Sequence, residues 1–393
     1  MDRKHLLEAA QKYAPRAIAI RRAIHRHPEV GNQEFRTAEH IAETLTQLGW
    51  EVSRPMGTSV VATLRGAHPG RTVAFRADMD ALRIQEASGV PFASEVPGVM
   101  HACGHDFHTA GLLGAAMLLT EFREQLKGCV KLFFQPDEEN DGGARRMIAA
   151  GCMENPHVDA VFGAHVDPNL PAGTIGLKYG KMYAAANIFR VTIHGVSCHG
   201  AAPENGVDAI AIGAQVVTAL QQIVSRRVAP TDSAVITVGT FHAGTQKNVI
   251  SNEAVLEGII RTLGLETRKK MLDLFAGTVR GICEGMGASV EIDITESYAG
   301  IVNRDEMVEL VRRAAAETLG TDRVRVMQQP TMGTEDFGYF IQDVPGAFYW
   351  IGVGNPQIGA DQPIHSPRFI ADESALASLM ALHAAVALSF LED

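Results

Sequence analysis

The segment VKLFFQPDEENDGGARRMIAA, residues 130–150, contains the unit on which the fold depends. Val130–Gln135 is a short apolar run with the length of a buried strand, Pro136 turns the chain, and residues 143–150 have the composition of a helix. Three further runs of this kind are predicted strands: Val60–Leu64, Thr72–Arg76 and Val158–Ala164. Residues 109–125 form another predicted helix between them. Because strands and helices alternate, the sequence predicts an α/β fold with a mixed sheet and helices on both faces.

A second pattern begins near residue 181. Three predicted strands are separated by two helical stretches: Phe189–His194, 207–225, Val235–Phe241, Ala254–Thr262 and 266–285. The β-α-β-β-α-β order is typical of a ferredoxin-like α+β domain. The first pattern then returns with a helix at 305–319, a strand at Ala347–Val353 and a helix at 373–391. We therefore expect a catalytic metal-binding domain of residues 1–180 and 298–393, with an inserted lid and dimerisation domain of residues 181–297.

Composition argues against nucleic acid and membranes as partners and indicates the redox state of the cysteines. The chain has 393 residues and a formal net charge of −10, which argues against nucleic acid, because phosphate binding needs a basic surface. Charged residues interrupt the apolar runs near the N-terminus, and no stretch is expected to reach the ~18 apolar residues that cross a membrane. The five cysteines are odd in number and widely spaced, which favours a reduced, cytoplasmic protein.

The densest chemical signal is HACGHDFH, residues 101–108, which holds three histidines, one cysteine and one aspartate. Imidazole and thiolate both bind zinc-like ions. Cys103 and His105 occupy alternate positions, which would point the same way from an extended loop. A polar loop with incidental histidines is the simpler interpretation of this segment taken alone.

Four weaker signals also follow predicted strands. Glu138 and Glu139 follow Pro136, so one carboxylate could bind a metal while the other holds a proton. His165 ends an apolar run, and His365 lies in the loop after Ala347–Val353. Asp78 could accept the outer N–H of a ligand histidine. Each signal is more often structural when it stands alone. Together they fall at the carboxyl ends of strands, where open α/β sheets bind ligands.

These motifs resemble the aminoacylase and carboxypeptidase family of dinuclear metallohydrolases, in its amidohydrolase branch. That branch includes hippurate hydrolases, auxin-conjugate hydrolases and N-acetyl-diaminopimelate deacetylases. The resemblance extends from HRHPEVGNQEF at 25–35, through RADMDAL, MHACGHDFH, QPDEE, GAHVDP and GTEDF, to HSPRF at 365–369.

The resemblance implies a site for two divalent ions: zinc, manganese, nickel or cobalt. Cys103 matches the bridging ligand, which is an aspartate elsewhere in the family. Glu139 and His365 match the ligands of one ion, and His105 and His165 those of the other. Glu138 matches the general base. Arg76 stands where the wider family has a histidine, which His105 would replace as a ligand.

The resemblance also implies roles for the inserted domain. His199, in SCHGAAPENGVDAI, matches a histidine that reaches the partner subunit's active site and steadies the tetrahedral intermediate, so a homodimer or dimer-based oligomer is expected. Asn248 and Arg261 match groups that hold the substrate carboxylate. The chain departs from the family at three positions that are not proposed ligands: Asp137 replaces alanine, Glu204 replaces histidine, and Ser251 replaces proline. These departures concern the preference for an acyl group.

The predicted activity is metal-dependent hydrolysis of the amide bond of N-acyl amino acids. A dipeptidase or carboxypeptidase could use the same dinuclear site on a peptide bond. A metal-binding scaffold without catalysis is a second alternative, although it would not need Glu138. A thiol redox protein based on Cys103 is a third, but the chain has no C-x-x-C motif.

Overall fold

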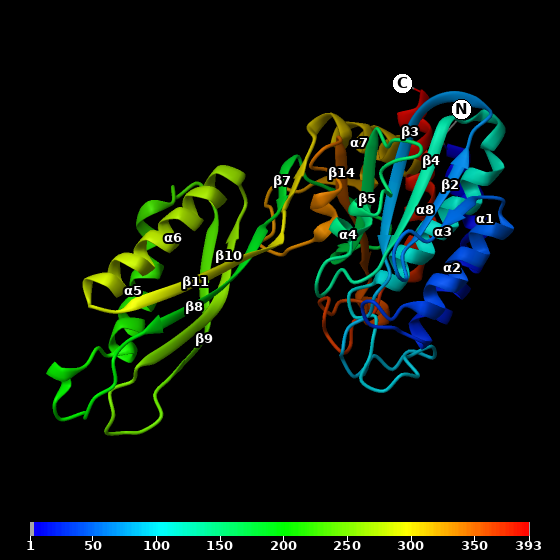
Figure 1. Cartoon of the computed structure of the whole chain (residues 1–393). Coiled ribbons are helices and arrows are strands. Elements are labelled where there is room, and N and C mark those ends of the chain that lie inside the picture. The colour runs from blue at the N-terminus through cyan, green and yellow to red at the C-terminus, as the bar shows by residue number, and fades with distance from the viewer. Residues whose placement is uncertain (1–3, 393) are drawn as a thin grey trace. The chain divides into compact units, whose positions relative to one another are not determined.

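The computed structural model describes residues 4–392, so residues 1–3 and 393 of the expected catalytic domain lie outside the described part (Figure 1). The chain divides into two compact units. The first contains the described residues up to Gly180, Val302–Pro330 and the described residues from Asp336 onward. The second contains Lys181–Ile301 and Thr331–Glu335. From the sequence, the chain was expected to re-enter the first unit near residue 298. The grouping of residues 331–335 with the second unit was not predicted.

An eight-stranded mixed sheet forms the centre of the first unit, as described, in the order β1-β2-β4-β3-β5-β14-β6-β13. Strands β4, β3, β5 and β14 run parallel to one another, and β2 and β6 are antiparallel to their neighbours β4 and β14. The strands are β1 (Glu51–Ser53), β2 (Val60–Arg65), β3 (His68–Asp78), β4 (Lys127–Gln135), β5 (Ala160–Pro171), β6 (Ile175–Leu177), β13 (Val324–Val326) and β14 (Gly346–Gly354).

The helices of this unit are α1 (Lys4–Arg26), α2 (Phe35–Gln47), α3 (His105–Glu121), α4 (Ala144–Ala149), α7 (Asp305–Leu319) and α8 (Leu376–Glu392). Helices α1, α3 and α8 pack against one another, and α3 and α8 also contact β3. Two glycines allow the close approach of α3 and α8. A Cβ at Gly111 would lie 2.5 Å from Leu379 Cδ2, and one at Gly114 would lie 2.6 Å from Met380 Cγ. Helix α3 is therefore held deep in the core, and its first residue is His105.

The expectation that no stretch reaches membrane-spanning length is wrong for Glu373–Glu392. Within the described residues it is the one helical stretch that passes on length and composition, with a mean hydropathy of 1.8. Its most apolar window is 83% buried inside the protein, as is usual for a core helix. The apolar character of α8 is thus accounted for by its packing against α1, α3 and α7.

The second unit has an antiparallel sheet in the order β11-β8-β10-β9. Its elements are β8 (Ala185–His194), α5 (Ala209–Arg227), β9 (Ala234–Ala243), β10 (Glu253–Thr262), α6 (Leu265–Gly285) and β11 (Ser289–Tyr298). Figure 1 shows α5 and α6 along one face of this sheet, where their apolar residues share a buried cluster with it. The short strands β7 (Gly180–Tyr183) and β12 (Ile301–Asn303) pair with each other where the chain passes between the units.

The observed architecture confirms the predicted fold class, a mixed-sheet α/β unit with an inserted ferredoxin-like α+β unit. Two details differ. Helix α3 begins at His105 rather than near residue 109. The fourth strand of the inserted unit, β11, is implied by the β-α-β-β-α-β order but was not located in the sequence, because its residues alternate between exposed and half-buried.

Candidate metal centre

The parallel strands bring several polar side chains to one edge of the large sheet. Strand β3 ends at Asp78 and β4 ends at Gln135, so Asp80 and Glu139 lie in the loops that follow. His165 was expected at the end of a strand but lies within β5, opposite Trp350 of β14. Because β5 pairs with β3 only as far as Gly163, His165 lies just past the end of β3. These groups meet because the carboxyl ends of parallel strands share one edge.

Gly104 turns the chain between Cys103 and His105. Its φ is +83°, and a Cβ there would lie 2.6 Å from Val166 Cγ2, so both the torsion and the space favour glycine. The turn starts α3 at once, so His105 projects from the first helical residue rather than from the expected extended loop.

Five side chains form two donor groups that share Cys103. One group is Cys103, His105 and His165, and the other is Cys103, Glu139 and His365; within each group the donor atoms lie within 4.8 Å of one another. Cys103 Sγ is 3.3 Å from His165 Nε2 and 3.3 Å from His365 Nε2. Two ligand atoms on one tetrahedral zinc ion are roughly 3.5 Å apart. The spacing therefore suits two cations with a common sulfur ligand.

The histidine tautomers suit the same arrangement. His105 Nδ1 lies 3.1 Å from Asp80 Oδ1, and His165 Nδ1 donates to the Val166 carbonyl at 2.8 Å. Each ring thus uses its outer nitrogen and leaves Nε2 directed at the cluster, as metal-bound histidines do. His105 Nε2 is buried without a hydrogen-bond partner, and Glu139 Oε1 lies 3.3 Å from His365 Nε2 and 3.8 Å from His105 Nε2. Cations would satisfy these atoms, so the residues present fit two metal ions.

The electrostatic balance of the cluster also favours cations. Burial alone would lower the pKa of His105, but Asp78, Asp80 and Glu139 raise it to about 10. Burial raises the pKa of the Cys103 thiol well above its usual range, and Glu139 and Glu138 raise it further. A surplus of carboxylates therefore surrounds His105 and Cys103. Metal ions would neutralise it by displacing protons from these groups.

Glu138 lies beside this cluster. It is 7% exposed, and a carboxylate oxygen lies within 4.8 Å of the donor atoms of His105 and Glu139. Glu138 is not part of either group that contains Cys103. It is therefore placed to exchange a proton with a molecule held against the cluster.

The proposed ligands differ in exposure. Cys103, His105 and His165 are buried, whereas the His365 side chain is 50% exposed. His365 has a φ of +65° and its backbone N–H donates to the Ala102 carbonyl at 2.8 Å. The open side of the cluster is thus the side formed by His365.

The expected partner of a ligand histidine was Asp78, but Asp80 contacts His105 through Nδ1 instead. Asp78 Oδ1 accepts from His108 Nδ1 at 2.6 Å, and Arg76 donates to Asp78 Oδ2 at 2.7 Å. His108 Nε2 accepts from the Val166 backbone N–H at 2.9 Å. Because one ring nitrogen accepts a hydrogen bond and the other donates one to Asp78, the His108 imidazole is neutral. Burial lowers the pKa of His108 to about 4, which agrees with this state.

Sequence reasoning missed the organising role of His108 and Asp336. Arg76 donates to Gln135 Oε1 at 2.8 Å and to Asp336 Oδ1 at 2.8 Å, and all of these groups are buried. Arg76 therefore ties the ends of β3 and β4 to the turn Asp336–Tyr339. His108 belongs to the HDFH segment and Asp336 to GTEDF, so both lay within quoted motifs but without a role.

The predicted catalytic residue His199 and the two predicted substrate-binding residues, Asn248 and Arg261, belong to the second unit. His199 is exposed, its Nδ1 accepts from the Ala201 backbone N–H at 3.1 Å, and its segment bridges to Val249 next to Asn248. Arg261 lies on β10 and donates to the Met332 carbonyl at 3.1 Å and to Thr334 Oγ1 at 3.2 Å. Their catalytic roles remain predictions.

A network of buried charges fastens the first turn of α3 to α1. His25 Nδ1 lies 2.8 Å from Asp106 Oδ2, His25 Nε2 lies 3.1 Å from Glu86 Oε1, and Arg21 donates to Asp106 at 2.9 Å. Burial would lower the pKa of His25, but Asp106 and Glu86 raise it to about 9. The imidazolium is therefore part of the network near neutral pH.

Replacing His25 with glutamine is expected to destabilise the metal-loaded protein in a pH-dependent way. Because the pKa of His25 rises on folding, its contribution is complete below about pH 6.5 and is lost as pH rises through about 9. A shift of this size corresponds to at most about 3 kcal/mol. Urea unfolding of wild type and H25Q from pH 6 to 10 would measure it. A stability difference that stays constant over this range would contradict the charged network.

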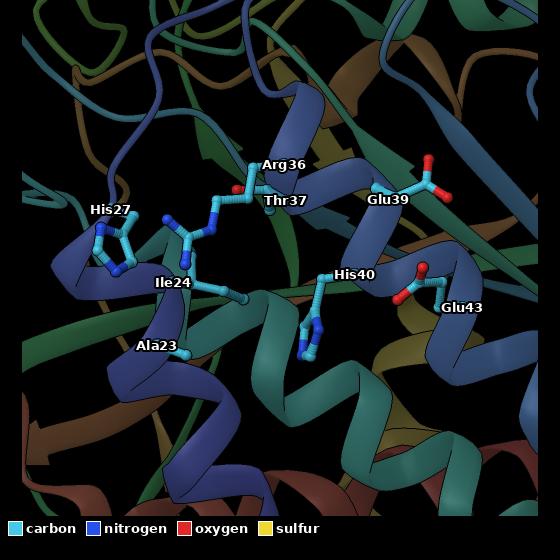
Figure 2. Close-up of a pocket in the computed structure, with 8 residues that line it drawn as sticks. All are labelled: Ala23, Ile24, His27, Arg36, Thr37, Glu39, His40 and Glu43. Atoms are coloured by element: carbon cyan, nitrogen blue, oxygen red, sulfur yellow. The ribbon is translucent and has the colours of Figure 1, made fainter.

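A separate hollow of about 360 Å³ lies between α1 and α2. Figure 2 shows its lining residues: Ala23, Ile24, His27, Arg36, Thr37, Glu39, His40 and Glu43. None of the proposed metal ligands lines it. The hollow is therefore distinct from the metal centre.

The arrangement of the metal centre agrees with the family comparison. Residues 74–389 match the model of peptidase family M20/M25/M40. The chain belongs to this family. The matched span contains every proposed ligand and Glu138, and it confirms the family that the motifs resemble.

Relatives within peptidase family M20/M25/M40 cover nearly the whole chain. An N-acyl-L-amino acid amidohydrolase from Geobacillus stearothermophilus is 44% identical over 335 residues, covering 83% of this chain and 90% of the relative. Thermostable carboxypeptidase 2 from Saccharolobus solfataricus is 40% identical over 378 residues, covering 95% of each chain. The YXEP protein of Bacillus subtilis, described as a dinuclear metal-binding peptidase of the M20 family, superposes with a TM-score of 0.85 at 36% identity, covering 97% of this chain and 99% of that one. The expected enzyme class, a metal-dependent amidohydrolase that uses two metal ions, is confirmed.

Proposed function

We propose that this protein hydrolyses the amide bond of N-acyl amino acids, with Cys103, His105, Glu139, His165 and His365 as metal ligands and Glu138 as general base. The observation that carries the proposal is the convergence of the two donor groups on Cys103 with the Glu138 carboxylate beside them. The 44% identical relative named as an N-acyl-L-amino acid amidohydrolase supports the same reaction.

Glu138 carries out the proton transfers in this proposal. When bound, two divalent ions supply Lewis acidity that polarises the amide carbonyl and lowers the pKa of water. Glu138 accepts a proton from the attacking water on a carboxylate oxygen. It then delivers that proton to the amide nitrogen, so the C–N bond breaks and the products are a carboxylic acid and a free amino acid.

The residues of the second unit supply the substrate contacts in this proposal. Asn248 and the Arg261 fork hold the α-carboxylate of the substrate, since a guanidinium can bond a carboxylate through two N–H groups. His199 stabilises the oxyanion in the active site of a partner subunit, with the inserted unit serving as lid and dimerisation domain. The bound ions are zinc, manganese, nickel or cobalt, and the protein acts in the cytoplasm as a homodimer or dimer-based oligomer.

A carboxypeptidase activity is the second candidate. It is favoured by the 40% identity to thermostable carboxypeptidase 2, which covers 95% of both chains. The same base and ligands would serve, because a peptide bond is also an amide next to an amino acid.

Metal analysis combined with a substrate panel tests these proposals. The protein would be loaded separately with zinc, manganese, nickel and cobalt and assayed on N-acetyl and N-benzoyl amino acids and on dipeptides. We expect two ions per chain and faster turnover of the N-acyl amino acids. Faster turnover of dipeptides would favour the carboxypeptidase, and a fully metallated protein that turned over neither class would refute both.

A further inference from the structure

Asp137 adopts an unusual backbone conformation next to the two functional glutamates. Its φ is +59°, in the left-handed region, and the residue is 1% exposed. That conformation is unfavourable for most L-residues, although aspartate and asparagine tolerate it best. Because Glu138 and Glu139 follow directly, the torsion at residue 137 sets the direction in which both of them leave the strand end.

Four hydrogen bonds hold Asp137 in this conformation. Its Oδ2 accepts from Asn32 Nδ2 at 2.7 Å and from the Arg146 guanidinium at 2.6 Å, and its Oδ1 accepts from Asn140 Nδ2 at 3.1 Å. Its backbone N–H donates to Glu34 Oε1 at 3.0 Å. The carboxylate thus joins three separate parts of the chain: the segment before α2, the loop after β4, and α4.

The surroundings are built to receive this carboxylate. Arg146 also donates to Asn32 Oδ1 at 2.9 Å, which closes a triangle of Asn32, Asp137 and Arg146. A Cβ at Gly31 would lie only 2.0 Å from Asp137 Oδ1. Gly31 therefore provides the space in which the Asp137 carboxylate sits, and any larger residue there would displace it.

We propose that Asp137 is a positioning residue: with Asn32 and Arg146, it locks the torsion that directs Glu138 and Glu139 toward the metal cluster. The inference rests on the proposed function for the roles of Glu138 and Glu139. Relatives with alanine at this position lack the carboxylate, so the dependence is specific to this chain, in which Asp137 is the shared acceptor of Asn32 and Arg146. Removing the carboxylate here takes away the bonds that compensate the left-handed conformation, and the two glutamates sample other directions. The rate of proton transfer by Glu138 and the affinity of the site for the ion that Glu139 binds should then both fall.

The test compares D137A with D137N in the full-length, metal-loaded enzyme. We expect D137A to lower kcat, and to weaken the affinity for one of the two ions, by about 10–100-fold, the usual range for residues that orient a metal site. KM should change little, because no substrate contact is removed. D137N keeps an oxygen acceptor and the tolerance of a left-handed φ, so it should recover most of both losses. Metal affinity, measured on the apoprotein by chelator competition, gives a readout that does not depend on turnover.

A double-mutant cycle between Gly31 and Asp137 sharpens the test. G31A leaves Asp137 in the sequence but pushes its carboxylate away, so it should reproduce the loss seen in D137A. In the D137A background, G31A should add little further, because the 2.0 Å approach to Asp137 Oδ1 is gone and the other close atom, Asn140 Nδ2 at 2.9 Å, is the end of a flexible side chain. Additive effects would overturn the link between the two residues.

The control is D141A, which removes the same charge from an exposed residue of the same loop. It should leave kcat and both metal affinities unchanged. If D137A matched wild type in kcat and in both metal affinities, or merely lowered thermal stability, the proposal would be overturned; equal losses in D137A and D141A would overturn it too. If D137A fails to fold, the R146M variant, which removes the guanidinium bound to Asp137, is tested instead by the same measurements of kcat and metal affinity. Wild-type turnover and metal content test the proposed function separately.

Discussion

Replacing Glu138 with glutamine is expected to lower kcat by about 10²–10⁴-fold, the range attributed to a positioned general base. Glutamine has nearly the same shape but cannot accept a proton from water at neutral pH. The two donor groups that share Cys103 do not include Glu138, so E138Q should still bind two ions per chain. Steady-state kinetics together with metal analysis of the same preparation would measure both effects.

E124Q is a suitable control for this experiment, because Glu124 is exposed in the turn after α3 and undergoes the same chemical change. It should have wild-type kinetics. An E138Q enzyme that keeps two ions and most of its activity would remove Glu138 from the role of base. Loss of one ion in E138Q would instead make Glu138 a ligand.

Replacing Cys103 with alanine is expected to abolish the binding of two ions. Its sulfur lies 3.3 Å from the Nε2 atoms of both His165 and His365, so its loss removes the donor common to both groups. The loss of affinity should exceed the roughly 10–100-fold that follows removal of a residue behind a ligand. C103D retains an anionic donor that zinc-like ions accept, and should retain two ions. Dialysis followed by metal analysis distinguishes the variants.

Cobalt-loaded protein gives a second readout for Cys103. Wild type should show a sulfur-to-cobalt band in the near ultraviolet, and C103D should bind cobalt without it. C152A serves as the control, because Cys152 is also buried but belongs to neither donor group. A C103A protein that bound two ions with wild-type affinity would exclude the thiolate as a shared ligand. Because the pKa of the metal-free thiol is raised, affinity should also weaken as pH falls.

Much of the fold could be predicted because buried strands and amphipathic helices leave regular apolar patterns. The β-α-β-β-α-β order of the inserted unit is an example, since three of its strands and both helices were found from sequence. Strand β11 was missed because only alternate residues, such as Val290, Ile292 and Ile294, are half-buried, and none is fully buried. Attention to that alternation would have found it. The start of α3 was misplaced because HDFH is polar, yet it is buried beside the metal centre.

The sequence indicated which residues form the site, but not which of their side chains contact one another. Strand ends and motif resemblance indicated which side chains would be near one another. They could not distinguish Asp78 from Asp80 as the partner of His105, because both aspartates lie at the same strand end and the choice depends on how the chain leaves it. Nor could they reveal the contacts of Asp137, whose partners Asn32 and Arg146 are 105 and 9 residues away in sequence.

His365 contributes to the centre from a loop only a short distance before α8, whereas Cys103 lies in the first third of the chain. During synthesis on the ribosome, the donor group with Glu139 therefore lacks one member until His365 has emerged, 262 residues after Cys103. Complete loading of the second ion must then wait for the His365 loop. Nascent chains halted before residue 365 would carry at most a partial, weakly binding set of donors.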